Sequence, residues 1–431
     1  MNNRWALIFS GLILLGIHIK ISFLSHSFIF GSGHAERPII EFLCWVSLAF
    51  LVYWLVLEQL RRNQPKHKVD RFPLAWIVMI GISIRLIYSS SQLIQETDPY
   101  RYIWDGQMIA AQHNPYSYSP QEAFELGLLS SNPLKPDAVQ AVHERINHPG
   151  VKTIYPPGAQ FLFALSQMMS PWSLAGWRGM VVVAEICILI LMILILKRLR
   201  LPLEWVALYA WSPLVIKEFS NSLHLDVFAV MFMCLMIYAF LRKHYRLALL
   251  SFAMATSIKW FAVILLPFLL IAFRQSLSKS LVSAAIFTGL IAASFVPFID
   301  AKTGTLFEGL LKFSSEWKVN DGLFTVIRGV VDRLPLPFDT NVISRIAVVM
   351  ILGMIFILSC RWLLERRTGS RFYQVSLLNL SALFFLIPTG NPWYFTWVFP
   401  FLLILPSRAL VAFSGLVFLY YLHNIVYYNH L

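Results

Sequence analysis

The fold is decided by the apolar stretch PLAWIVMIGISIRLIYSS at residues 73–90 and the acidic stretch ETDPYRYIWDG at residues 96–106. The first is long enough to cross a lipid bilayer as one helix. The second stretch, with three carboxylates, one arginine and three aromatic side chains, opens the longest polar interval of the chain, residues 91–156. A carboxylate at the edge of a bilayer costs free energy unless it is paired or solvated. The acidic stretch is therefore the leading candidate for chemistry.

The composition of the whole chain is that of an integral membrane protein. Of its 431 residues, 58% are hydrophobic and only 13% are charged, whereas a soluble domain holds about 25% charged residues. Apolar runs of roughly 20 residues recur between short polar breaks, which predicts an all-α, polytopic transmembrane helical bundle of about 11–13 apolar segments. A β-barrel would instead show short segments of alternating polarity. We see no internal repeat and no soluble domain, so residues 1–431 are expected to form a single membrane domain.

Positive charge is concentrated in short breaks and predicts the orientation of the bundle. The net charge is +13, with basic clusters at residues 61–71, 197–200, 242–246 and 361–371. Short basic loops mark the cytoplasmic face and can meet anionic lipid headgroups. The polar intervals 91–156 and 300–341 then become a first and a second outer loop, on the periplasmic side of the inner membrane if the source is bacterial. No extended basic domain offers a binding surface for nucleic acid.

Two regions leave the path of the chain open. Residues 158–172 are short for a span and precede a longer apolar run at 176–196, so one of the two does not cross fully if the following basic break is cytoplasmic. Residues 247–273 carry Lys259 near their middle and form either one long span or two half-helices of a re-entrant hairpin. We favour the hairpin, because it returns Arg274 to the basic side.

Residues 98–112 predict a short amphipathic helix at the start of the first outer loop. Pro99 suits the first turn of a helix, and Asn114 with Pro115 would end it. Apolar side chains share parts of one side at helical spacing, so we expect this helix to lie in the membrane interface. Residues 117–150 are polar and predict a folded loop.

Glu96 and Asp98 are the candidate catalytic pair. Sugar transfer needs a carboxylate that accepts a proton from the acceptor hydroxyl as the new bond forms. Two nearby carboxylates could also hold a divalent cation through hard oxygen ligands, which leaves a metal requirement open. The structural alternative is an ion pair from Asp98 or Asp105 to Arg101, or anchoring at the interface. The dense carboxylates favour chemistry, because aromatic belts are built from Trp, Tyr, Lys and Arg.

Other polar islands fall on the same expected face. His224 and Asp226 could bind a sugar or a metal, although a lone pair of this kind is more often structural. Lys259 lies in an apolar run, where ionisable residues are functional candidates. Its structural alternative is snorkelling, or pairing with a buried carboxylate such as Glu185 or Glu218. Guanidinium and ammonium groups bind phosphate oxygens, and the candidates of this kind are Arg145, Lys152 and Arg178. Their structural alternative is snorkelling to the membrane interface.

Aromatic side chains accompany two of the later islands. Glu316 precedes Trp317 in the second outer loop, and Asn391 precedes Trp393 and Tyr394 near the end of the chain. Such rings can stack on sugar faces. Taken singly, each fits the aromatic belt of the membrane interface better.

Together these motifs resemble those of a known group of enzymes. ETDPYRYIWDG at 96–106, NPY at 114–116 and TIYPP at 153–157 are similar to the first outer loop of the polyprenyl-phosphate-sugar-dependent glycosyltransferases of the GT-C superfamily. The resemblance is strongest to bacterial polyprenol-phosphomannose-dependent mannosyltransferases. It extends, in the order of that family, to His224-x-Asp226, Glu316-Trp317 with Asn320, and Asn391-Pro392-Trp393-Tyr394.

This resemblance implies a multi-span fold with an active site at the outer membrane face. It implies the inverting transfer of a hexose, with mannose as the expected sugar, from a polyprenyl-phosphate-linked donor to a hydroxyl of a lipid or a glycan. The acidic motif would supply the base, for which we prefer Asp98, with Glu96 orienting it or the acceptor. The residues expected to contact donor or acceptor are Arg101, Tyr102, Asp105, Lys152, Tyr155, Arg178, His224, Asp226, Lys259, Glu316, Asn391, Trp393 and Tyr394.

Two other functions stay open. A polytopic lipid or sugar transporter usually shows internal repeats and charged residues along a pathway at the membrane midplane, whereas the acids here lie in an outer loop. A non-catalytic subunit of a glycosyltransferase complex would tolerate Glu96→Gln and Asp98→Asn without a change in cellular glycans.

Overall fold

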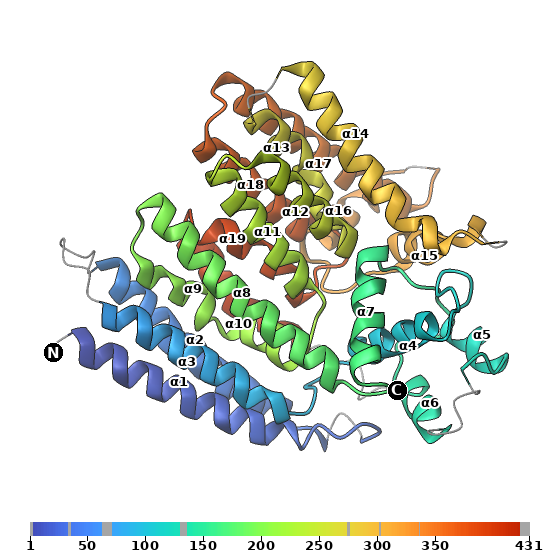
Figure 1. Ribbon diagram of the computed structural model, residues 1–431, viewed down its shortest axis with the longest axis horizontal. Helices are drawn as coiled ribbons and strands as arrows, with labels where there is room; N and C mark the ends of the chain where they lie inside the picture. The colour runs from blue at the N-terminus through green and yellow to red at the C-terminus, as the bar shows by residue number, and fades with distance from the viewer. Residues whose placement is uncertain are drawn as a thin grey trace.

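The computed structural model describes residues 3–32, 36–62, 71–129, 136–273, 276–300, 303–335 and 337–422 (Figure 1). These residues form helices and no strand, apart from one isolated backbone bridge between Val319 and Thr389. The predicted all-α architecture is confirmed.

Within the described residues, six helices are long and apolar enough to cross a membrane. They are α1 (Asn3–Ser25), α2 (Ile39–Arg62), α3 (Arg71–Ile87), α8 (Ala175–Leu199), α14 (Leu277–Phe295) and α17 (Thr340–Glu365). Other helices of the bundle include α11 (Asp226–Leu241), α12 (Tyr245–Ile258), α13 (Leu266–Ala272), α18 (Gly369–Leu386), α19 (Phe399–Leu402) and α20 (Arg408–Leu416). The protein is therefore an integral, multi-pass membrane protein.

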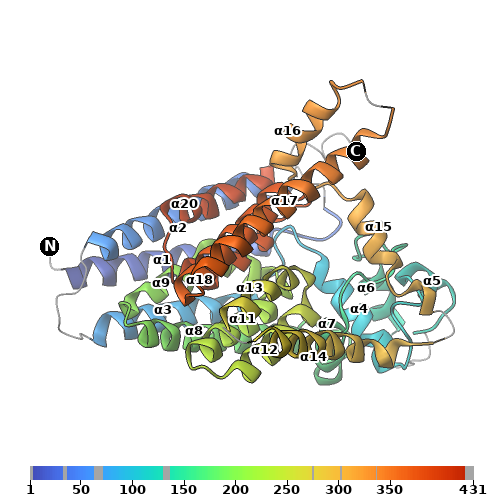
Figure 2. The same ribbon diagram turned by 90° about the horizontal axis from the view of Figure 1, so that it is seen from above.

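The two ends of the bundle differ in chemistry. α1 and α2 pack against each other, and the turn that follows α1 contributes Phe28 and Phe30 to a cavity beside Asp98. Arg61 and Arg62 end α2, so they lie at the end of this helix pair remote from that cavity. Figure 2 shows the short helices of the polar loops gathered at the end opposite to the N-terminus. The acidic stretch and the basic end of α2 are thus separated by the length of the bundle.

Residues 203–221 do not form a regular span. They fold into η3 (Leu203–Val206), α9 (Ala207–Ala210), α10 (Pro213–Val215) and the π-helix η4 (Ile216–Asn221). Pro213 has no N–H to donate and so interrupts the helix, while Ser212 caps α10 by accepting from the Val215 N–H. Every side chain from Val206 to Asn221 is buried. An irregular backbone is tolerated inside a membrane bundle where protein surrounds it, and π-helical turns often occur at functional sites.

The apolar run at 247–273 is broken at Lys259. α12 ends at Ile258, Lys259 is extended, and the chain continues as η5 (Trp260–Leu265) and α13. The run is therefore two helical pieces and not one continuous helix, and the re-entrant hairpin stays a prediction. Arg274, which favoured a hairpin, lies outside the described residues, as do residues 63–70 of the first basic break.

The second open region is settled by helix length. α7 (Pro157–Met169) has 13 residues and is too short to cross a bilayer, whereas α8 has 25. The prediction that only one of these two segments is a full crossing agrees with these lengths.

The two polar loops fold against each other. The first contains α4 (Asp98–Ala110), α5 (Pro120–Glu125) and α6 (Pro136–His143), which confirms the helix predicted at its start. The second contains η7 (Thr303–Thr305), α15 (Glu308–Glu316) and α16 (Gly322–Val331). Asn114 Nδ2 and Ser117 Oγ donate to Asp300 Oδ2 at 2.8 and 2.6 Å, which joins the loops at one end of the bundle.

Candidate active site

α4 places the acidic stretch against the bundle. Pro99 occupies the first turn, where its missing N–H costs nothing. A Cβ on Gly106 would come within 2.5 Å of the Phe163 carbonyl oxygen, so the glycine allows α4 to approach α7 closely. One turn earlier, the ring of Tyr102 stacks on that of Phe163 at 4.6 Å. Tyr102 was expected to contact substrate, but in the structure its ring is buried in this packing.

The loop before α4 is held by the π-helix η4. The side chain of Asn221 accepts from the Ile94 N–H at 3.1 Å and donates to the Gln92 carbonyl at 2.7 Å. Gln95 then turns the chain with a positive φ of 51°. These contacts bring Glu96 to the residues that follow η4, more than a hundred positions further along the chain.

Glu96 is fully committed to protein partners. Its Oε1 accepts from the backbone N–H groups of Thr97 and Asp98, both at 2.9 Å. Its Oε2 lies 3.0 Å from Nε2 of His224. Burial raises the pKa of this carboxyl, but the His224 imidazolium outweighs it, so the pKa is lowered and Glu96 is ionised. Glu96 therefore fixes the first turn of α4 and favours the protonated form of the His224 imidazole.

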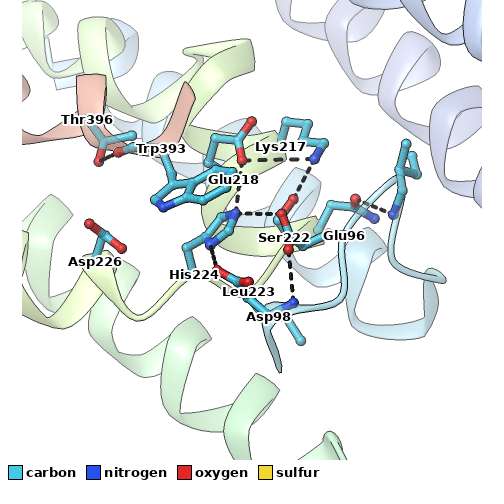
Figure 3. Close-up of polar contacts among 12 residues, drawn as sticks. Glu96, Asp98, Lys217, Glu218, Ser222, Leu223, His224, Asp226, Trp393 and Thr396 are labelled. Atoms are coloured by element: carbon cyan, nitrogen blue, oxygen red, sulfur yellow. Dashed lines mark hydrogen bonds and ion pairs between the residues drawn. The ribbon is translucent and has the colours of Figure 1, made fainter. Parts of the chain in front are cut away.

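His224 lies at the centre of a cluster of carboxylates (Figure 3). Its Nε2 is 3.0 Å from Glu96 Oε2 and 3.3 Å from Glu218 Oε2, and its Nδ1 is 3.8 Å from Asp98 Oδ2. The indole of Trp393 stacks on the imidazole at 3.8 Å and fixes the plane of the ring. Burial lowers the pKa of His224, yet Glu96 and Glu218 raise it to about 9 overall. The ring is therefore cationic at neutral pH.

Asp98 is the carboxylate of this cluster that remains accessible. Its side chain is 27% exposed, whereas that of Glu96 is 6% exposed and that of Glu218 is fully buried. Burial, followed by the negative charge of Glu96, raises the pKa of Asp98 to about 7, against the opposing effect of His224. A carboxylate with a pKa near the working pH is suited to general base catalysis.

Glu218 is held in place by hydrogen bonds that involve Tyr421, Lys217 and Ser222. Tyr421 Oη, from η9 (Val417–Leu422), donates to Glu218 Oε1 at 2.8 Å. Lys217 Nζ donates to Tyr421 Oη and to Ser222 Oγ, both at 2.6 Å. All four side chains are buried. The sequence singled out Glu218 only as a structural partner for Lys259, and the structure corrects this pairing.

Lys259 pairs with Asp226, not with Glu185 or Glu218. Its Nζ lies 3.3 Å from Asp226 Oδ2, and Trp397 Nε1 donates to Asp226 Oδ1 at 2.6 Å. The extended backbone at the break between α12 and η5 places Lys259 here. The same ammonium group lies over the ring of Tyr394 at 4.9 Å.

A cavity of about 580 Å³ opens beside Asp98. Its lining includes residues of the turn after α1, the acidic stretch, the loop that follows α6, and η8 (Pro392–Val398). The chemically distinctive members of the lining are Arg37, Glu96, Asp98, Arg145, Trp393 and Tyr420. The guanidinium of Arg145 lies between the rings of Phe30 and Tyr100, at 5.0 and 5.1 Å. One side of the cavity is therefore cationic and aromatic, and the other carries the carboxylate of Asp98.

The other predicted contact residues lie outside the lining of this cavity. Arg101 pairs with Asp105 at 2.7 Å, as the structural alternative predicted, and Tyr155 is packed in the core. Lys152 pairs with Glu308 at 2.8 Å, and Arg178 donates to the backbone carbonyls of Tyr88 and Ser91. Glu316 is exposed at the end of α15, and Asn391 precedes η8.

No group of three or more His, Cys, Asp and Glu side chains in the described part of the chain is arranged to hold a metal ion. The carboxylates of the cluster instead face His224, Lys217 and Lys259. The expectation of a possible divalent cation receives no support from this geometry.

A family model for glycosyltransferase family 87 matches residues 153–388. The chain belongs to this family. Family 87 is of the GT-C type of polyprenyl-phosphate-sugar glycosyltransferases, which confirms the resemblance stated from the sequence. No curated protein and no solved structure is similar enough to the chain to match it.

The family 87 match covers one part of the site. The matched residues include Glu218, His224, Asp226 and Lys259, whereas the acidic stretch lies before them and Trp393 after them. Sequence reasoning missed the placement of Arg37 in the cavity, because nothing in its local pattern distinguishes it. Glu218 carried a detectable signal, since a carboxylate in an apolar segment is a functional candidate.

Proposed function

We propose that the protein is an inverting glycosyltransferase that moves a hexose, in our proposal mannose, from a polyprenyl-phosphate-linked donor to a hydroxyl of a lipid or glycan. The family supports transfer of a sugar.

One observation carries the catalytic assignment. Asp98 lines the cavity with a pKa raised to about 7, while its neighbour Glu96 is tied to two backbone N–H groups and to His224. The two acids of the motif therefore divide their roles. Asp98 is available to accept a proton, and Glu96 positions it.

The cationic side of the cavity supports a phosphate-bearing donor. Arg145 lies over two aromatic rings, and it forms no ion pair with a carboxylate in the described part of the chain. Arg37 donates to the Gln95 side chain at 2.7 Å and lines the same cavity. Guanidinium groups bind phosphate oxygens through paired N–H donors. In this proposal Arg145 and Arg37 replace Arg101, Lys152 and Arg178 as the phosphate contacts, because those three lie outside the lining of the cavity.

The reaction follows from these positions. The acceptor hydroxyl oxygen attacks the anomeric carbon on the face opposite the phosphate, and Asp98 takes the hydroxyl proton as the new bond forms. The bond from the anomeric carbon to the phosphate oxygen breaks, and polyprenyl phosphate leaves with the electron pair. The configuration at the anomeric carbon inverts. A phosphate is already a good leaving group, so this mechanism needs no strong general acid.

The charge distribution supports action at the outer face. The basic end of α2, at Arg61 and Arg62, is remote from the cavity, and short basic segments favour the cytoplasmic side. The cavity would then open on the periplasmic side of a bacterial inner membrane.

A vesicle assay tests this proposal. The purified protein is reconstituted with polyprenyl phosphates carrying mannose, glucose, galactose or a pentose and with envelope lipids as acceptors, and products are identified by mass spectrometry. We expect transfer from the mannose donor, and a loss of about 10²–10⁴-fold in kcat in Asp98→Asn. Asp137→Asn, at an exposed position in the first turn of α6, is the matched control. Full turnover by folded Asp98→Asn would remove the proposed base.

A further inference from the structure

The charges around His224 form a line with a definite order. Glu218 approaches Nε2 of the imidazole from η4, and Asp98 faces Nδ1 from the start of α4. Figure 3 shows the imidazole between the two carboxylates. Glu96 also faces Nε2, and Trp393 covers one face of the ring. Glu218 does not line the cavity, so it does not reach a substrate there.

We propose that Glu218 is a positioning residue that acts on Asp98 through the His224 ring. This inference rests on the proposed function, because it takes Asp98 as the base. The carboxylate of Glu218 acts together with that of Glu96 to keep the imidazole protonated, and the imidazolium in turn keeps Asp98 ionised and ready to accept a proton.

The geometry around Glu218 suits this role. Its Oε1 accepts from the Tyr421 hydroxyl, and its Oε2 lies 3.3 Å from His224 Nε2 and 3.9 Å from Lys217 Nζ. Among the described residues, none forms a well-aligned hydrogen bond with Glu218 Oε2 or with either nitrogen of His224, so the interaction between the two residues is mainly one of charge. Charges interact more strongly in a buried site than in water, because the local dielectric constant is low.

The need for the imidazolium follows from the other charges that face Asp98. Glu96 and Asp226 repel a negative charge on Asp98, whereas His224 and Lys259 attract it. Lys217 lies behind Glu218 and next to Tyr421. If the imidazole became neutral, Lys259 alone would oppose the effects of burial and of the two anions. Asp98 would then hold its proton to a higher pH.

Acting through His224, Glu218→Gln should change the pKa of Asp98 in the direction opposite to the usual one. Removal of a nearby negative charge normally lowers the pKa of a carboxyl, because the ionised form is less repelled. Acting through His224, the same substitution should raise the pKa of Asp98, because the carboxylate loses its cation. The pH at which kcat rises should therefore move upward in Glu218→Gln, with a kcat at neutral pH about tenfold or more below that of the wild type and an unchanged KM.

The experiment measures the pH profile of kcat in the reconstituted full-length protein. In the wild type we expect kcat to rise with pH through about 7, the pKa of Asp98. Glu218→Gln should shift this rise upward, and Glu218→Asp, which keeps the charge but withdraws it by about one methylene, should shift it less. Asp137→Asn is the control, since it neutralises an exposed carboxylate in the first turn of α6. A downward shift or no shift in folded Glu218→Gln overturns the proposal.

A second measurement does not depend on activity. NMR of protein labelled in its histidine rings reports the pKa of His224, with its signal assigned by its loss in His224→Gln. We expect a pKa of about 9 in the wild type and lower values in Glu218→Gln and Glu218→Asp. An unchanged value in either folded variant overturns the proposal. If the pKa of His224 is lowered in the variants but the wild-type protein transfers no sugar, the effect of Glu218 on His224 is supported and the proposed function is rejected.

Discussion

Arg85 with Glu185, and Asp98 with its neighbours, are two ways in which this bundle buries charge. Arg85 Nε donates to Glu185 Oε1 at 2.8 Å, and its Nη1 donates to the carbonyls of Gly81 and Ala210. Ser220 Oγ donates to Glu185 Oε2 at 2.5 Å. Both charged side chains are fully buried, and each has a dedicated partner of opposite sign. This pair joins α3, α8 and η4 and carries no excess charge.

The cluster around His224 is not balanced in this way. Four carboxylates share three cations, and the cations are His224, Lys217 and Lys259. If all seven groups are ionised, the cluster carries one net negative charge. Asp98 is the partly exposed carboxylate that can remove this charge by taking up a proton. The comparison teaches that a balanced buried pair stabilises the fold, whereas a cluster with surplus charge keeps one group ready to titrate.

The largest effect that separates the two clusters is expected on stability. Glu185→Gln should lower the free energy of unfolding by about 3–5 kcal/mol, because it leaves the buried guanidinium of Arg85 without its anion. Chemical unfolding in detergent, with Glu308→Gln as the exposed control, measures it. A loss below about 1 kcal/mol would show that Arg85 finds other compensation.

The next effect concerns two arginines in opposite situations. Arg85 is paired with a carboxylate and donates to two backbone carbonyls, whereas Arg145 faces the cavity between two aromatic rings. Arg145→Met should raise the KM for a polyprenyl-phosphate donor by about 10–100-fold, since a hydrogen bond to a charged group contributes about 1.5–3 kcal/mol. Steady-state kinetics in vesicles measures this, with Arg328→Met in α16 as a control away from the cavity. An unchanged KM would place the phosphate elsewhere.

The pH dependence of stability should also differ between the clusters. The pKa of Asp98 is about 7 in the folded protein, against an ordinary value of 3.8. Between these values the folded protein binds more protons than the unfolded chain, so the contribution of Asp98 to stability is present at low pH and is lost as the pH rises to about 7. Asp98→Asn should therefore raise Tm relative to the wild type at about pH 8, with little gain at about pH 4.

Thermal unfolding at these two pH values checks this expectation. Glu185→Gln should instead lower Tm at both. An Asp98→Asn protein less stable than the wild type at the higher pH would mean that the ionised carboxylate stabilises the fold.

The smallest effect is expected where charges meet at the surface. Lys152 and Glu308 join the two polar loops, and the carboxylate is 57% exposed. Lys152→Met should change the free energy of unfolding by about 0.2–1 kcal/mol, as is usual for exposed ion pairs. The same variant tests the sequence-based assignment of Lys152 to substrate binding. A large rise in the KM for the donor would support that assignment and weaken the case for Arg145.

Several features could be predicted because they depend on local pattern. Hydropathy predicted a helical membrane protein, and Pro99 with the spacing of apolar residues predicted α4. The motif at 96–106 pointed to the enzyme class that the family match supports. Lys259 pairs with a buried carboxylate, as the structural alternative held, but the partner is Asp226, because the sequence does not reveal which carboxylate faces the break between α12 and η5.

The sequence by itself determined that the chain is a membrane bundle, that its acids gather in polar loops, and which residues can titrate. These properties follow from the free energy of placing each side chain in lipid or in water, which depends on residue type. Only the tertiary structure decided that Glu96 pairs with His224, that Asp98 stays accessible, and that Glu218 contacts Nε2 of the imidazole from outside the cavity. Such distinctions depend on distances of a few ångströms between segments far apart in the chain, and the electrostatic energies that separate the roles of these acids change steeply over that range.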